Sequence, residues 1–137
     1  MKRSLLVFLT LLVVFVFSGC SNKSDIVVTD YETGKTAVEF SSKDYQEEAA
    51  KIIDMINYLS DEEIHTTESP KYRVHFIDPK DSKYDIWFSV YDIDNRLYVK
   101  MLTEKMSEHY SSFYDDSVKE VTTITVDEFY DIISKEY

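Results

Sequence analysis

Three stretches of alternating apolar and polar residues between positions 72 and 101 place the tightest limit on how this chain folds. They cover 72–77, 84–91 and 97–101, and short segments rich in Asp, Asn and Pro separate them. Alternation with a period of two is typical of strands with one buried face. Because such short polar turns join antiparallel neighbours, the pattern predicts an antiparallel meander.

Further strands are expected on both sides of this meander. The segments 26–31 and 36–40 predict a hairpin in which Gly34 takes a positive φ at the turn. A last strand is predicted over 118–125. The segment 60–70 is polar and is predicted to be an irregular connection.

The first predicted helix follows the hairpin. Ser41 or Ser42 is expected to cap it, with Asp44 completing a pattern that resembles a capping box. Apolar residues then recur at spacings of three and four, which gives the helix one apolar face. They are Tyr45, Ala49, Ile52, Ile56 and Leu59.

A second helix is predicted at the end of the chain. Thr125 and Glu128 form a capping box, and an apolar face follows at Phe129, Ile132 and Ile133. The expected order is therefore two strands, a helix, four strands and a helix. It predicts an α+β fold of two layers, with two amphipathic helices on a mainly antiparallel sheet of five or six strands.

Glycine is scarce and acidic residues are abundant, and both facts exclude classes of partner. The chain has two glycines, too few for the glycine-rich loops that hold nucleotide phosphates. Its 26 acidic residues against 15 Lys and Arg give a formal net charge of −11, which repels nucleic-acid backbones. We therefore expect no nucleotide and no nucleic acid among the partners.

The beginning of the chain has the organisation of a secretory signal. Lys2 and Arg3 precede a run over 5–17 that is apolar except for Thr10, and small residues then lead to Cys20. In a helix this run spans about 20 Å, less than the roughly 30 Å of a bilayer's hydrocarbon core. A permanent membrane span is therefore disfavoured.

Phe17-Ser18-Gly19-Cys20 resembles the lipobox of bacterial lipoproteins, with Phe17 at the position where Leu is usual. This resemblance implies cleavage between Gly19 and Cys20 and acylation of the Cys20 thiol. Such a lipid anchor would hold the protein on the extracytoplasmic face of the cell membrane. Cys20 is the only cysteine, so no intramolecular disulfide can form.

The expected organisation is a cleaved signal peptide (1–19), a lipidated start with a short tether (20–24) and one α+β domain (25–137). Loss of Lys2 and Arg3 would leave 13 basic residues against 26 acidic ones, a formal net charge of −13. The four tether residues after the cysteine reach at most about 14 Å. We therefore expect the partner to be a membrane or envelope protein.

Catalytic and metal-binding patterns are not evident in the sequence. Pairs of acidic residues such as Asp115-Asp116 are expected by chance on so acidic a surface. An EF-hand loop starting at Asp92 lacks the Gly at position six, and Asp94-Asn95 is better explained as a hairpin turn. The histidines, which lack the spacing of a zinc site, are His65, His75 and His109. We expect no enzyme activity, no metal and no cofactor.

One face of the predicted meander is a candidate docking face. It carries the residues that alternate with the expected core, and these are aromatic and basic: Arg73, His75, Trp87, Tyr91, Tyr98 and Lys100. Trp, Tyr and Arg are enriched in binding hot spots. Two alternatives stay open, because the segment 102–117 could cover this face and cross-strand pairs could simply stabilise the sheet.

The layout of the mature chain resembles that of small surface lipoproteins of Gram-positive bacteria, some of them carried on conjugative elements. That resemblance implies a role in exclusion or immunity, in which the lipoprotein blocks a partner in the same envelope. We expect a non-enzymatic protein that acts by protein contact at the membrane surface. The alternative is a lipoprotein that binds a sugar, a peptide or a wall fragment. An open sheet would favour the first and a deep aromatic pocket the second.

Overall fold

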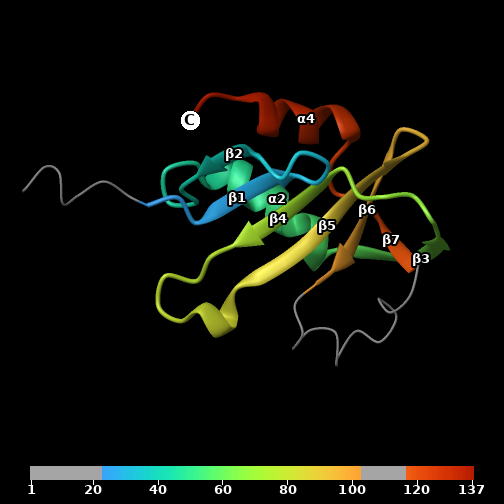
Figure 1. The fold of residues 1–137 in the computed structure, drawn as a ribbon, viewed down its shortest axis with the longest axis horizontal. Coiled ribbons are helices and arrows are strands. Elements are labelled where there is room, and N and C mark those ends of the chain that lie inside the picture. Colours follow the sequence, from blue (N-terminus) through green and yellow to red (C-terminus); the bar gives the residue numbers. More distant parts are fainter. Residues whose placement is uncertain (1–22, 103–116) are drawn as a thin grey trace, which may run out of the picture.

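Residues 23–102 and 117–137, which the computed structural model describes, form seven strands and two α-helices around one core (Figure 1). In chain order the elements are β1 (Ile26–Asp30), β2 (Thr36–Phe40), α2 (Gln46–Asn57), β3 (Leu59–His65), β4 (Tyr72–Phe76), the 3₁₀ helix η1 (Ser82–Tyr84), β5 (Ile86–Ile93), β6 (Arg96–Met101), β7 (Ser117–Val121) and α4 (Val126–Ser134). The strands join one sheet in the order β2-β1-β4-β5-β6-β7-β3, and every pair is antiparallel. The predicted α+β class with an antiparallel sheet is confirmed.

The sheet has more strands than the five or six predicted, because part of the expected connection over 60–70 is strand β3. Its sequence is largely polar, and most of its side chains are exposed. β3 lies at the edge of the sheet and pairs only with β7, where Ile64 lies opposite Val118. Backbone pairing and two apolar pairs at its ends, Leu59 with Val121 and Ile64 with Val118, hold the strand, so the sequence lacks the alternation that identifies other strands.

The two predicted helix caps have different outcomes. Helix α4 has the expected capping box: Glu128 N donates to Thr125 Oγ1 (3.2 Å), and Thr125 N donates to Glu128 Oε2 (2.8 Å). The predicted cap of α2 is wrong, because α2 follows Tyr45 and has no side-chain cap. Ser42 instead donates from its backbone N to the Asp25 carboxylate (2.7 Å) and from its hydroxyl to the same group.

The turns of the two hairpins agree with the sequence. Gly34 has a φ of 69° between β1 and β2. Asp94 and Asn95 have φ values of 52° and 59° in the tight turn between β5 and β6, where such values suit the twist of the strands. Several strand boundaries differ from the prediction by one or two residues, among them that of β5, which starts at Ile86 after η1, and β7 ends at Val121, four residues earlier than predicted.

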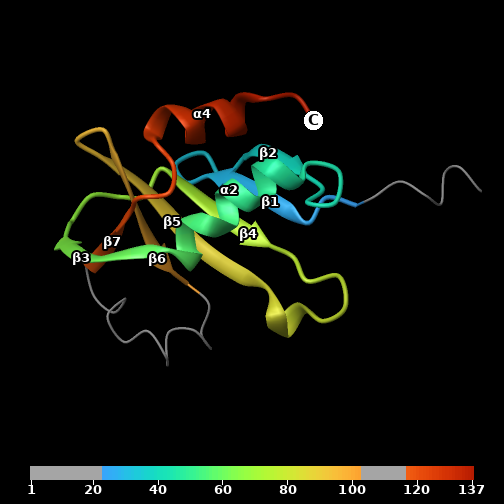
Figure 2. The same cartoon turned by 180° about the vertical axis from the view of Figure 1, so that it is seen from behind.

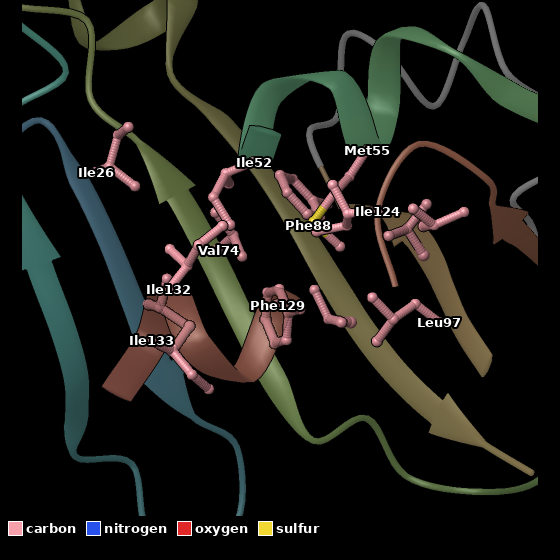
Figure 3. Packing of buried hydrophobic residues seen from close by; sticks show 14 of the residues in the cluster. Ile26, Ile52, Met55, Val74, Phe88, Leu97, Ile124, Phe129, Ile132 and Ile133 are labelled. Carbon is pink, nitrogen blue, oxygen red and sulfur yellow. The ribbon is translucent and has the colours of Figure 1, made fainter. Parts of the chain in front are cut away.

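The core lies between the two helices and one face of the sheet (Figures 2 and 3). Figure 3 shows Ile52 and Met55 of α2 and Phe129 and Ile132 of α4 converging on this face. The strand residues that meet them are fully or almost fully buried: Val74, Phe88, Val90, Leu97 and Val99. Alternation along β4, β5 and β6 therefore predicted the buried face correctly, and the other face points away from the helices.

Candidate docking face

The six predicted docking residues lie together on the face that the helices leave uncovered. Cross-strand register places Arg73 opposite Ser89 and Ser89 opposite Lys100. In the same way His75 lies opposite Trp87, and Tyr91 opposite Tyr98. Partners in an antiparallel pair point to the same side of the sheet. The pattern of the meander thus identified the members of this face.

Two of the six docking-face residues are already packed against other side chains of the protein. Tyr91 and Tyr98 are only 9% and 7% exposed, and they form a second small core with Val118. Ile64 and Ile93 pack against this cluster from the edges. Burial is also the main reason that the pKa of Tyr91 is raised. This part of the face stabilises the sheet, and only a minor part of each ring is open to a partner.

The other end of the face holds a stacked pair of aromatic rings. The imidazole of His75 lies on the indole of Trp87, with ring centroids 3.5 Å apart and an interplanar angle of 12°. His75 Nε2 is 2.8 Å from Asp85 Oδ2, and Asp85 Oδ1 accepts from Asp78 N at 2.7 Å. The Asp78 N–H first, and His75 second, lower the pKa of the Asp85 carboxyl. These contacts fix the 77–85 loop to the sheet and hold Trp87 with 38% of its surface exposed.

Tyr31 extends the face at the opposite end of the strands. The Arg73 guanidinium carbon lies 5.6 Å from the centre of the Tyr31 ring, and Tyr31 is 45% exposed. Sequence reasoning placed Tyr31 at the end of the predicted strand 26–31 but did not predict the neighbour of that strand in the sheet. The pairing of β1 with β4 brings it beside Arg73. Its position at the end of that predicted strand was the available signal.

A hollow of about 540 Å³ lies next to Tyr31, between the β1–β2 turn and the segment that leads into β4. Its lining mixes aromatic and charged residues with Ser69 and Pro70: Asp30, Tyr31, Glu32, Glu68, Lys71 and Tyr72. Thr33 donates from its backbone N and its hydroxyl to Asp30, and these bonds lower the pKa of that carboxyl. Tyr72 has a raised pKa because it is partly buried. The hollow is open on one side and is not a deep aromatic pocket.

Potential metal ligands lie apart from one another in residues 23–102 and 117–137. Within those ranges no three His, Cys, Asp or Glu side chains are grouped to hold a metal ion. His75 is paired with Asp85, and His65 is exposed at the end of β3. Gly19, Cys20 and the predicted signal lie outside the described residues, as do His109, Asp115-Asp116 and most of the segment 102–117, which could cover the docking face.

Comparison with known proteins provides no relative for the fold or for the site. No protein-family model, curated protein or solved structure matches the chain significantly. Neither α2 nor α4 combines the length and apolar character that a membrane-crossing helix requires, and no other helix in the described ranges does.

Proposed function

We propose that this chain is an extracytoplasmic lipoprotein, anchored by lipid on Cys20, that acts without catalysis by protein contact at the membrane surface. The observation that carries the proposal is the lipobox-like Phe17-Ser18-Gly19-Cys20 directly before a folded domain. One acyl chain binds membranes only marginally, and the diacylglycerol of bacterial lipoproteins supplies the second chain that stable anchoring requires.

The distance between the anchor and the domain supports a role close to the bilayer. Asp25 is already part of the fold, since its backbone N donates to Phe40 O (3.2 Å) and its O accepts from Ile77 N (2.8 Å). Its carboxylate also accepts two hydrogen bonds from Ser42. Asp25 lies five positions after Cys20, with four residues between them, which corresponds to at most about 18 Å. The domain can therefore reach only partners at or near the membrane surface.

Protein contact is favoured by the character of the docking face. Arg73 and Tyr31 form an exposed cation–π pair, and both residue types are common in binding hot spots. An open sheet face beside a shallow hollow suits a protein surface better than an enclosed small molecule. We propose that this contact serves exclusion or immunity, in which such a protein blocks a partner in its own envelope.

The anchor is tested by replacing Cys20 with Ala and fractionating the cells. We expect the wild-type protein in the membrane fraction, released by detergent and not by high salt. The Cys20→Ala protein should keep its leader or appear in the soluble fraction. A Cys20→Ala protein that matures and stays with membranes would contradict the anchor.

The contact is tested with a photo-crosslinking phenylalanine analogue placed at Tyr31 in intact cells. Tyr58, which is 65% exposed at the end of α2 and off the docking face, provides a matched control position. We expect a discrete adduct with a membrane or envelope protein from position 31, no such adduct from position 58, and loss of the adduct when Arg73→Glu is added. Equal capture from both positions would contradict the assignment.

A ligand is the second candidate function, and the hollow beside Tyr31 is the observation that favours it. Its volume lies within the range of small-molecule sites, and its tyrosines and carboxylates could contact the faces and hydroxyls of a sugar. Titration with soluble peptidoglycan fragments, followed by NMR of the amides near Tyr31 and Tyr72, tests it. Saturable shifts confined to the hollow would support ligand binding, and their absence would leave protein contact as the function.

A further inference from the structure

The strand ends nearest the tether carry a row of side chains across the docking face. Val27 lies opposite His75, and His75 lies opposite Trp87. Leu102 continues the row, since Phe88 pairs with Met101 and the Leu102 N donates to Trp87 O (2.9 Å). We call Val27, His75, Trp87 and Leu102 the anchor-end row.

This row lies close to the point where the tether enters the fold. Val27 follows Asp25 by two residues, and Trp87 is two strands away from Val27, about 10 Å at the usual strand spacing. That separation is within the reach of about 18 Å between Cys20 and Asp25. The 77–85 loop projects from the same end of β4 and β5 (Figure 1).

Exposed apolar surface is concentrated at this end. Among the described residues, five large hydrophobic side chains are exposed, and three of them belong to the row or to the adjoining loop. These are Trp87, Leu102 (37% exposed) and Tyr84 (60% exposed). Trp and Tyr concentrate at the interface between lipid and water, because each ring has an apolar body and one polar group.

Charges in the loop are largely satisfied within the protein. Asp85 accepts from Asp78 N and bonds His75, and Asp78 accepts from the backbone N of Lys80 and Asp81. Asp81 forms an ion pair with Lys83 at 3.2 Å, and the same Lys83 ammonium lies 4.9 Å from the Tyr84 ring centre. The carboxylates of the 77–85 loop are thus already engaged with donors. The exposed Glu39 lies opposite Val27 on the edge strand β2, at the end of the row away from Trp87 and Leu102.

We propose that the anchor-end row and Tyr84 rest in the interfacial layer of the bilayer that carries the lipid anchor. The inference depends on the proposed function, because it is the anchor that brings this end to the membrane. The contact is apolar: the mature chain's net charge of −13 gives it no attraction to anionic headgroups. It fixes the domain's orientation, with Tyr31 and the hollow at the far end of the strands and directed away from the membrane.

Trp87 is the only tryptophan of the chain, so its fluorescence reports on this contact alone. The chain from Cys20 onward can be coupled through its single thiol to a maleimide lipid in phosphatidylcholine vesicles. We expect the emission of Trp87 to shift to shorter wavelength and to be quenched by lipids brominated on their acyl chains. The same protein with its thiol blocked, mixed with the same vesicles, should show neither effect, because the row alone is too small to hold the protein.

Matched variants distinguish direct contact between the row and the lipid from mere proximity of Trp87 to the membrane. Leu102→Ser and Tyr84→Ser should each remove most of the quenching while Trp87 is retained, whereas Tyr58→Ser, at the end of α2 and outside the row, should leave it unchanged. Circular dichroism of each variant establishes that it is folded. Unaltered emission of the coupled wild type, or equal quenching in all three variants, would overturn the proposal.

A blue shift that depends on protein concentration and not on vesicles would assign the row to a second copy of the chain and would also overturn the proposal. Because the coupling is chemical, the test does not depend on lipidation in the cell. If the fluorescence test fails, the membrane contact of the row is wrong and the lipid anchor is unaffected. If Cys20 proves to be unmodified in cells, the anchor is wrong, whatever the fluorescence of the coupled protein shows.

Discussion

The two faces of the sheet are built from alternate residues of the same strands, yet their surroundings differ. Phe88 and Val90 on the helix side are buried in the core cluster that also contains residues of both helices. Trp87, the preceding residue on β5, points to the other side, stacks on His75 and remains 38% exposed. A single register therefore divides one strand into residues that hold the fold and residues that can meet a partner.

The uncovered face is itself divided. Tyr91, Tyr98 and Val118 close one part of it as a second small core, whereas Trp87 and Arg73 stay accessible at other positions. Aromatic composition alone therefore does not identify a docking residue. Only the neighbours supplied by β7 and β3 distinguish a packed tyrosine from an available one.

The largest expected effect tests the contrast between the two faces on adjacent residues. Phe88→Ala removes a fully buried ring from the core and should lower the free energy of unfolding by about 3–5 kcal/mol. Trp87→Ala removes mainly a stacking contact and should lower it by about 1 kcal/mol. Urea unfolding followed by far-ultraviolet circular dichroism measures both values. Similar losses of unfolding free energy in the two variants would contradict the difference between the two faces.

A middle-sized effect is expected at Asp85, which joins the 77–85 loop to the docking face. Asp85→Ala leaves Asp78 N and His75 without their acceptor and should cost about 1–3 kcal/mol. The pKa of Asp85 is below its usual 3.8, so its stabilising effect is complete above that pH and is lost as the pH falls through the lowered value.

The difference in unfolding free energy between wild type and Asp85→Ala should therefore be constant near neutral pH and shrink below about pH 4. Urea titrations at a series of pH values measure it. A difference that grows with acidification would contradict the arrangement of Asp85 with its two donors.

The smallest effect concerns the helix that covers the buried face. Thr125→Ala removes the side-chain acceptor for Glu128 N and should lower the free energy of unfolding by about 1 kcal/mol. Thr125→Ser keeps the hydroxyl and serves as the matched control. A loss in the Ser variant equal to that in the Ala variant would show that the capping bond is not the source of the stability.

Local patterns predicted the parts of this fold that are local in origin. The capping box of α4 lies within four consecutive residues, and the alternation from 72 to 101 specifies both faces of the meander. The cap of α2 was mispredicted because Ser42 bonds Asp25, 17 positions earlier in the chain. Strand β3 was missed because pairing with β7 holds a largely polar sequence in place.

The docking face shows the same limit. Its six members follow from alternation, but the burial of Tyr91 and Tyr98 depends on strands that join the sheet from elsewhere in the chain. Tyr31 lies on the face because β1 pairs with β4, and no turn or motif in the sequence predicts this pairing. Sequence reasoning therefore identified which residues share a surface and not which of them remain accessible.

The most direct test of the account is the intact mass of the protein isolated from its own membranes. We predict a chain that begins at Cys20, lacks residues 1–19 and carries the added mass of diacylglycerol on the cysteine. A polypeptide without lipid, or one that retains its first nineteen residues, would contradict the anchor, the membrane location of the domain and the orientation inferred from both.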